Sequence, residues 1–300
     1  MAVHLTTFPP LSNSMRFPVT SEQHLRRRAV LVAPGSDERK ASKALASAAD
    51  EVVLDLEDAV TPDRKPAARD LIAPLIHEHG ADRTVSVRIN GRGTEWFEDD
   101  LRACAELGTA LASIVFPKVE SADDLTEAHR ILGENSGVGI QASSRPRPVS
   151  RTSTRSSRPP RRRRHHRLRR SRRRTGTRAH RTARTLAVRP GSRATRARAA
   201  GLQAIDGPFL GIADDDAFRH SAQWVSDLGF DGKWVIHPSQ IESATAAFTP
   251  TDEQVEAARK VLAALEEAEA RGAGAAQLDG QMLDEAIAVA ARRTLTKIGA

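Results

Sequence analysis

The alternation of short apolar runs with longer amphipathic stretches is the feature that most constrains the fold of this chain. Five runs rich in Val and Ile, each followed by a helical pattern, lie between Arg26 and Ala142, and two more follow Ala199. Strands that alternate with helices at a spacing of roughly 30 residues indicate βαβ units and a parallel sheet. The predicted strands are Ala29–Val32, Glu51–Leu56, Thr84–Ile89, Leu111–Phe116, Gly137–Gln141, Gly201–Ile205 and Gly232–Ile236.

Capping residues and helix breakers predict the ends of the helices. Ser36 is expected to cap the first helix, with Asp37 and Glu38 in its first turn. Pro74 predicts a kink or an early stop in the second helix, and Gly108 suits the end of the third. A fourth helix is expected to start at Ser121, and a fifth is expected to cover Asp214–Leu228. A long helix is expected to run from a capping box of Thr251 and Gln254 to Gly272, and the last helix is expected to cover Asp279–Thr296.

Seven strands with room for one more in the central gap predict an α/β fold of the TIM (β/α)8 barrel type. An open doubly wound sheet is the competing architecture, but no glycine-rich phosphate-binding turn follows the first strand. The expected division is a flexible N-terminal arm at residues 1–24, the first half of the barrel at 25–142, an arginine-rich low-complexity segment at 143–198, the last barrel strands at 199–248, and a C-terminal helical extension at 249–300.

The arginine-rich segment and the rest of the chain carry opposite net charges. Between Arg145 and Arg198 there are 22 Arg, no Lys and no acidic residue, and the remainder carries 24 basic against 38 acidic residues, a net charge of −14. The overall charge of +8 therefore does not identify a nucleic-acid-binding protein. A segment of this composition cannot bury enough apolar surface to offset the entropy of ordering, so it is predicted to be disordered and to disrupt the region of the fifth and sixth strands.

Two interpretations of this segment remain. It is either a basic arm that contacts nucleic-acid phosphates non-specifically, or the out-of-frame translation of a GC-rich gene, entered near Ala142 and left near Ala197. The second is favoured because the segment interrupts a predicted strand that has already begun and replaces part of a repeating fold. The alternative function that follows from the first is a non-catalytic polyanion-binding protein.

The remaining composition excludes several classes of protein. Cys104 is the only cysteine, which rules out an intrachain disulfide, and it is expected to be a small buried hydrophobe. The chain contains no run of about 18 apolar residues, so no membrane span is expected. The first residues lack the apolar stretch of a secretory signal, which leaves the cytoplasm as the expected location.

Polar residues follow the predicted strands at the ends where a parallel barrel carries its active site. They are Asp55, Glu57 and Asp58, then Arg88 and Asn90, then Lys118 and Glu120, then Asp206, and finally His237. Carboxylates beside an Arg and a Lys suit Mg²⁺ together with an anionic substrate, because carboxylate oxygens bind Mg²⁺ and a guanidinium recognises a carboxylate in a planar bidentate pair.

Each of these residues also has a structural interpretation. A functional role is favoured for Glu120, and for Arg88 because an unpaired charge at an apolar strand end is costly. Asp55 suits a turn cap equally well, and Glu57 and Asp58 suit solvated loop acids. Lys118 and His237 fit structural roles better. The tryptophans are expected to pack in the core; they are Trp96, Trp224 and Trp234.

Six blocks of sequence occur in a fixed order: LVAPGSDERKASKALASAADEVVLDLEDAV, VSVRING, IVFPKVESADDL, GLQAIDGPF, LGFDGKWVIHPSQI and LDGQMLDEAIAVAARR. Together they resemble the HpcH/HpaI aldolase–citrate lyase β-subunit family, in its CoA-ester lyase branch. The resemblance covers about Arg26–Ala142 and Ala199–Ile298. It implies a barrel of the phosphoenolpyruvate/pyruvate superfamily type, a Mg²⁺ cofactor, and carbon–carbon cleavage or formation in a 3-hydroxyacyl-CoA thioester such as citryl-, malyl- or citramalyl-CoA. It also implies a homo-oligomer, commonly a trimer or hexamer.

The resemblance assigns roles to individual residues. Arg88 matches the arginine that holds the substrate carboxylate, and Glu120 matches a glutamate that binds Mg²⁺ and substrate. Asp55 and Glu57 match the block that lines the substrate site. Asp284 matches a C-terminal lid aspartate that reaches a neighbouring subunit's site, and it is a candidate general base.

One feature of the family pattern is missing. The resemblance implies a second Mg²⁺ ligand, an aspartate in a glycine-rich strand that follows Glu120 by a few tens of residues. This chain has no acidic residue between Glu134 and Asp206. Activity of this exact chain is therefore expected to be poor or absent.

Overall fold

The structure is a computed structural model that describes residues 25–119, 121, 123–133, 137–143, 194–195, 197–198, 200, 202–273 and 275–298. It divides into a sheet unit, Arg26–Thr251, and a C-terminal unit that includes Asp252–Ala300. The arm expected at residues 1–24 and most of the arginine-rich segment, residues 144–193, lie outside the described residues. Both therefore stay predictions.

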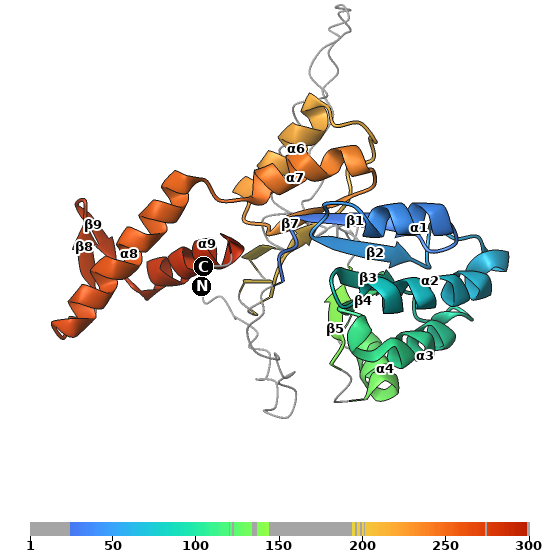
Figure 1. Ribbon diagram of the computed structural model, residues 1–300. Coiled ribbons are helices and arrows are strands. Elements are labelled where there is room, and N and C mark those ends of the chain that lie inside the picture. The colour runs from blue at the N-terminus through green and yellow to red at the C-terminus, as the bar shows by residue number, and fades with distance from the viewer. Residues whose placement is uncertain are drawn as a thin grey trace, which may run out of the picture. The chain divides into compact units, whose positions relative to one another are not determined.

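Seven parallel strands form the sheet of the sheet unit (Figure 1). They are β1 (Ala29–Pro34), β2 (Glu51–Asp55), β3 (Thr84–Arg88), β4 (Ser113–Phe116), β5 (Gly139–Ala142), β6 (Ile205–Asp206) and β7 (Gly232–Val235). Every predicted strand is present, which confirms the hydrophobic pattern as the main signal. The boundaries differ most at β6, which is shorter and shifted toward Asp206, whereas the ends of the other strands lie within two residues of the predicted ones.

Helices follow the strands as the alternation predicts. They are α1 (Glu38–Leu45), α2 (Lys65–His79), α3 (Phe97–Leu107), α4 (Asp123–Leu132), α6 (Asp216–Asp227) and α7 (Ile241–Phe248), with short 3-10 turns at Pro62–Arg64, Gly108–Ala110 and Pro238–Gln240. Gly108 ends α3 with a φ of +53°, as expected for a glycine at a helix C-terminus.

One predicted helix cap was wrong, and one of the two outcomes expected at Pro74 is not observed. Asp37, not Ser36, caps α1, because its backbone is the last extended position and its carboxylate accepts a hydrogen bond from Lys40 N at 3.0 Å. The early stop at Pro74 does not occur, since α2 continues to His79. The buried positions Ala68, Ile72 and Ile76 lie on one face of α2, and their packing on both sides of Pro74 outweighs the missing hydrogen bond.

The strand order is that of a barrel opened on one side. It runs β5-β4-β3-β2-β1-β7-β6, so β1 lies between the second strand and the last one. A doubly wound sheet reverses its order at a switch point, and no reversal occurs here. The missing pairing falls between β5 and β6, which is where the sequence left room for an eighth strand. The described sheet is thus a parallel half-barrel, and the full barrel stays a prediction.

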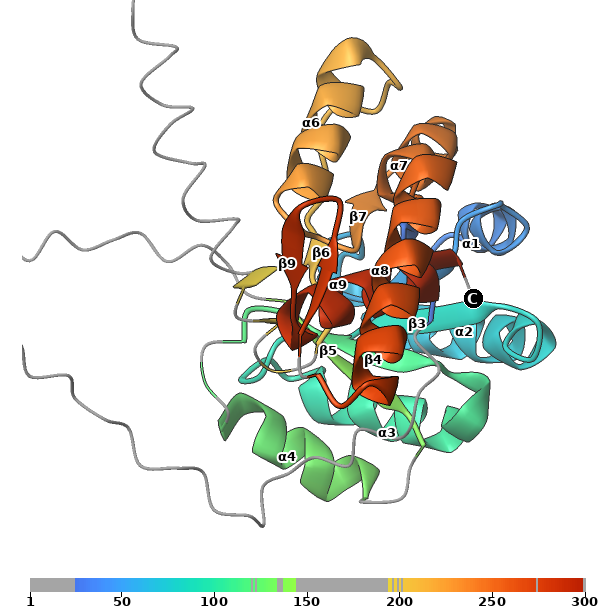
Figure 2. The same cartoon turned by 90° about the vertical axis from the view of Figure 1, so that its left-hand side faces the viewer.

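The two faces of the sheet have different compositions, since side chains alternate along each strand. One face packs under helices α1 to α4 and α7, with a core that includes Val52, Leu54, Val85, Val87 and Ile114. The helices lie around this outer face (Figure 2). The inner face carries a smaller apolar cluster, Val30, Val53 and Val115. Polar residues lie on both sides of this cluster along the strands, which divides the interior into layers.

A buried polar network occupies the layer at the amino ends of the strands. Glu51, which is fully buried, accepts hydrogen bonds from Arg27 at 2.7 Å, from Gln141 at 2.6 Å and from Ser86. Arg27 also donates to Gln203, just before β6, at 2.8 Å. Since Gln141 belongs to β5, three strands away from Glu51, the sheet must curl to bring them together, and the network links both of its open edges.

The C-terminal unit consists of two helices and a hairpin. Helix α8 (Asp252–Ala270) packs along α9 (Glu285–Ile298), and β8 (Ala276–Leu278) pairs with β9 (Gln281–Leu283). The prediction of a helix from Asp279 was wrong, because Asp279 and Gly280 have φ of +50° and +79° and form the hairpin turn. The Asp-Gly pair is the usual signal for such a turn. None of the described helices is long and apolar enough to span a bilayer.

Candidate active site

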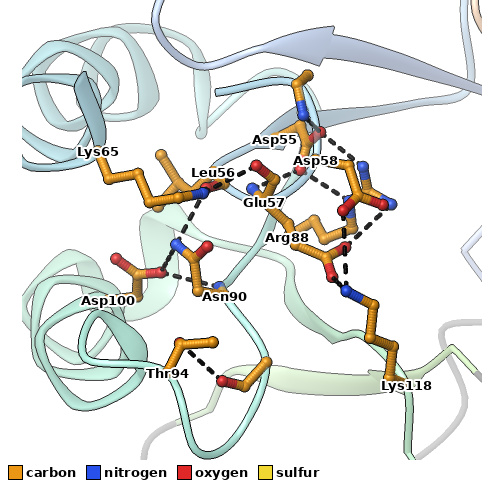
Figure 3. Close-up of polar contacts among 12 residues, drawn as sticks. Asp55, Leu56, Glu57, Asp58, Lys65, Arg88, Asn90, Thr94, Asp100 and Lys118 are labelled. Atoms are coloured by element: carbon orange, nitrogen blue, oxygen red, sulfur yellow. Dashed lines mark hydrogen bonds and ion pairs between the residues drawn. The ribbon is translucent and has the colours of Figure 1, made fainter. Parts of the chain in front are cut away.

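An ion pair between Asp55 and Arg88 lies at the carboxyl ends of β2 and β3 (Figure 3). The two residues are partners in the strand register and both point into the sheet interior. Arg88 Nε donates to Asp55 Oδ1 at 2.7 Å, and Nη2 donates to Oδ2 at 2.6 Å. Asp55 also accepts from the backbone N–H of Glu57 at 2.8 Å and of Ala59 at 3.0 Å. Both carboxylate oxygens are therefore fully used, and Arg88 is held in one orientation.

The remaining contacts of Arg88 leave part of its guanidinium available. Nη1 lies 3.3 Å from Glu57 Oε2, and the Trp234 ring, on β7, lies 5.5 Å from Cζ. Burial disfavours the cation, but the hydrogen bonds and charge of Asp55 outweigh it, so the pKa of Arg88 is raised above its ordinary value. One Nη2 hydrogen has no acceptor among the described residues. This is the donor that a ligand carboxylate needs.

Glu57 connects Arg88 with a second cation. Its Oε1 lies 2.6 Å from Lys118 Nζ, and only 6 % of its side chain is exposed. Lys118 follows β4 in a turn with a φ of +57° and also lies 3.8 Å from the exposed Asp58. The predicted residues Asp55, Glu57, Asp58, Arg88 and Lys118 are thus brought together at one edge of the sheet, although their proposed chemical roles are untested.

A buried polar network holds the loop that carries Glu57. Lys65 donates to the carbonyl oxygens of Leu56 at 2.8 Å and Glu57 at 2.9 Å, and Asn90 donates to Leu56 O at 3.0 Å. Asn90 in turn bonds the fully buried Asp100 through both its backbone N–H and its side chain, at 2.9 and 2.7 Å. Asn90, a predicted rim residue, therefore supports the loop and does not join the carboxylate cluster.

Burial also changes the titration of Lys65. Its ammonium lies 5.0 Å from the centre of the Trp96 ring. Desolvation lowers the pKa of Lys65, and the charges of Asp100, Asp55 and Glu57 oppose this shift without cancelling it. The ammonium is matched by two carbonyl acceptors and an aromatic face, which suits a structural cation.

A cleft of about 790 Å³ opens beside this cluster. Its lining includes the charged residues Glu57, Asp58 and Lys118, the aromatic residues Trp96 and Phe116, and the loop Gly91–Thr94. The size and mixed lining are typical of a small-molecule site.

Two other predicted residues of the sheet unit, Asp206 and His237, lie outside the cluster described above. Asp206 pairs with Lys233 at 2.5 Å. His237 accepts from Ser239 N at 3.2 Å, which caps a short turn and confirms its structural interpretation. Asp284 belongs to the C-terminal unit, where it accepts from Ile287 N at 3.2 Å at the start of α9. Glu120 lies outside the described residues, so its role stays a prediction.

The described carboxylates do not form a Mg²⁺ site as they are arranged. Asp55 is saturated by four donors, and each oxygen of Glu57 faces a cation. Within the described residues, no group of three His, Cys, Asp or Glu side chains is placed to hold a metal ion. A bound Mg²⁺ would need ligands from other parts of the chain, of which Glu120 is the candidate from the sequence.

Sequence reasoning missed three supporting residues. Lys65 reads as an ordinary first-turn residue, and Asp100 as one of several acids at a helix start that complement the dipole. Trp234 was expected to pack in the core, yet it is only partly buried and faces Arg88. Its place at an interior position of the last strand, three residues before His237, was the available signal.

The described residues thus form a parallel α/β half-barrel with an ion-paired arginine and a cleft at the carboxyl ends of its strands. Residues 28–155 match the family model described as HpcH/HpaI aldolase/citrate lyase. The chain belongs to this family, which confirms the resemblance.

Two relatives and one solved structure show how far the similarity extends. A (3S)-malyl-CoA thioesterase of Cereibacter sphaeroides strain ATCC 17025 is 34 % identical over 282 residues, which cover 90 % of this chain and 94 % of the relative. The citrate lyase subunit beta of Leuconostoc mesenteroides subsp. cremoris is 30 % identical, and the match covers 90 % of this chain and 92 % of the relative. Protein CitE from Mycobacterium tuberculosis, solved with magnesium, acetoacetate and coenzyme A, superposes on this chain with a TM-score of 0.57 at 28 % identity. The superposition covers 91 % of this chain and 98 % of the CitE chain.

Proposed function

We propose that this protein cleaves or forms a carbon–carbon bond in a 3-hydroxyacyl-CoA thioester of the citryl-, malyl- or citramalyl-CoA type. The observation that carries the proposal is the Arg88 guanidinium, fixed by Asp55 and Glu57 at the strand ends with a donor to spare. The relatives support the substrate class, since two act on malyl-CoA or citrate by name and one was solved with coenzyme A.

Arg88 holds the carboxylate of the acid half of the substrate in this proposal. In the cleavage direction a base takes the proton of the 3-hydroxyl group, and that oxygen becomes the carbonyl of an oxo acid. The electrons of the broken C2–C3 bond form the enolate of the thioester, which then takes up a proton at C2. Arg88 and Lys118 stabilise the developing negative charge. Asp284 stays the proposed general base, supplied to the site by a neighbouring subunit.

Mg²⁺ is part of the proposal on the strength of the CitE structure and of Glu120. When bound, it supplies a Lewis acid and a charge template. Because no acidic residue occurs between Glu134 and Asp206, the second ligand implied by the family pattern is missing, and activity is expected to be weak. We also propose that the protein is a homo-oligomer and that it is located in the cytoplasm.

The test is an assay of purified protein with Mg²⁺ and malyl-, citramalyl- or citryl-CoA. Acetyl-CoA together with an oxo acid reports lyase chemistry, whereas free CoA without an oxo acid reports thioester hydrolysis. In parallel, calorimetry measures binding of glyoxylate and oxaloacetate to the wild type, to Arg88→Met and to the control Arg102→Met, an exposed arginine on α3. We expect binding that Arg88→Met abolishes and Arg102→Met retains. Absence of binding to the wild type overturns the proposal, and a kcat on the order of 10 s⁻¹ contradicts only the expected impairment.

A further inference from the structure

The contact between Arg88 and Trp234 joins two strands that are not neighbours. Arg88 ends β3 and Trp234 lies on β7, with β2 and β1 between them in the sheet. Three strand spacings of about 4.8 Å separate such residues in a flat sheet. Only the curl of the sheet brings the indole within 5.5 Å of the guanidinium carbon, so Trp234 faces Arg88 across the interior.

Trp234 is an unusual member of the interior layer. Its neighbour Val235 is fully buried in the core under the helices, which places Trp234 on the opposite, inner face. It groups there with Val32 and Ile205, and all three are only partly buried. These residues form an apolar surface opposite the carboxylates that hold Arg88.

The contacts of Arg88 determine where a ligand can approach. Asp55 takes the edge formed by Nε and Nη2, Glu57 lies beside Nη1, and Trp234 lies against the guanidinium. A carboxylate that uses the second Nη2 hydrogen binds close to the indole, whose ring centre lies 5.5 Å from Cζ. The group attached to that carboxylate then lies against Trp234 and its apolar neighbours.

We propose that Trp234 is the wall of the Arg88 carboxylate subsite and limits the size of the acid that binds there. It favours an unbranched oxo acid such as glyoxylate over one branched next to the oxo group, such as 3-methyl-2-oxobutanoate. This inference rests on the proposed function, because it assumes that Arg88 binds the acid half of the substrate.

The experiment uses the full chain and two independent readouts. Calorimetry measures the Kd of both acids for the wild type, Trp234→Phe, Trp234→Ala and the control Trp224→Phe, which changes a tryptophan on α6 that packs against a separate apolar cluster. Tryptophan fluorescence follows the same titrations, and circular dichroism compares the fold of each variant. We expect Trp234→Ala to shift the selectivity roughly tenfold toward the branched acid, the range seen when a pocket loses bulk. Trp234→Phe is expected to lose the fluorescence response, which Trp224→Phe retains.

The possible failures are distinguishable. If neither acid binds the wild type, the proposed function and this inference are both overturned. If binding depends on Arg88 while Trp234→Ala leaves the selectivity unchanged, or the fluorescence response persists in Trp234→Phe, the proposed function stands and the inference alone is overturned. If Trp234→Ala does not fold, an unchanged selectivity and fluorescence response in the more conservative Trp234→Phe overturns it.

Discussion

Replacing Asp55 by Ala is expected to destabilise the sheet unit more than any change confined to its surface. The Asp55 side chain is fully buried, whereas 17 % of the Arg88 side chain is exposed. Removal of Asp55 leaves the Arg88 cation with Glu57 alone, and it also frees two backbone N–H groups, those of Glu57 and Ala59.

The size of the effect follows from these contacts. Breaking a buried ion pair by removing one partner costs about 3–5 kcal/mol, because the other charge stays desolvated. Each backbone donor left without an acceptor adds on the order of 1 kcal/mol, reduced where solvent reaches the loop. The two contributions together give about 5 kcal/mol once solvent access to the loop is allowed for, a large share of the roughly 5–15 kcal/mol that stabilises a typical domain.

Removing the unpaired charge should restore part of this loss. In Asp55→Ala/Arg88→Met no buried cation remains, so we expect the double variant to be more stable than Asp55→Ala alone by about 1–3 kcal/mol. Urea unfolding followed by circular dichroism measures the free energy of unfolding of the wild type, of Asp55→Ala and of the double variant. Asp37→Ala is the control, because that exposed aspartate also accepts a backbone hydrogen bond but holds no buried charge; its loss should be smaller. A double variant less stable than Asp55→Ala would refute the reasoning.

Two further predictions concern single side chains. Burial disfavours the Asp50 carboxylate, but the hydrogen bonds and charge of Arg28 outweigh it and lower the pKa of Asp50 below 3.8; the pair therefore stabilises the fold above about pH 4 and is lost as pH falls through the lowered pKa. As the pH is lowered, the free energy of unfolding of Asp50→Asn should fall less steeply than that of the wild type. Equal slopes of the two unfolding free energies against pH contradict this. Burial, with a smaller contribution from Asp100, raises the pKa of the Cys104 thiol; iodoacetamide at pH 8 should label it only in urea, and rapid labelling of the native protein would contradict its burial.

The strands and the position of the rim followed from the sequence because they depend on local patterns. Short apolar runs rich in Val and Ile placed β1 to β3 to within two residues, and the barrel rule placed Asp55 and Arg88 at one edge. The residues that support this rim could not be predicted from the sequence. A lysine at a helix start is usually solvated, and only the packing of α2 against the loop after β2 brings Lys65 onto the carbonyls of Leu56 and Glu57.

Long-range contacts set the other limit. Gln141 and Glu51 are 90 residues apart, and their hydrogen bond depends on the curl of the sheet, which no local pattern encodes. The hairpin turn at Asp279 and Gly280 is a different case, because its signal was present in the sequence and the helical pattern after it was extended too far toward the N-terminus.

The arginine-rich segment makes a prediction about the gene that can be worked out residue by residue. Serine codons of the TCN type, read one nucleotide earlier, become NTC, which encodes Phe, Leu, Ile or Val whatever the preceding base. Ser143 and Ser144 then extend the β5 run with two apolar residues. The next serines are Ser150, Ser153, Ser156 and Ser157, whose spacing gives the apolar face of a helix in that frame. Threonine codons between them become NAC, which encodes only polar residues or Tyr. With TCN codons, a strand end and an amphipathic helix would therefore return in the order that the fold requires.

A frameshift that enters near Ala142 explains this coincidence, whereas a genuine basic arm does not. We expect resequencing of the gene to show a single-nucleotide insertion or deletion near the codon for Ser143 and a compensating one near the codon for Ala197. The corrected chain should supply the acidic residues that are absent before Asp206. The intact mass of the native protein is the independent measurement, since the corrected chain lacks most of the 22 arginines between Arg145 and Arg198. Serine codons of the AGY type, a stop codon in the shifted frame, or a mass equal to that of the present sequence would each exclude the frameshift and leave the basic segment as part of the protein.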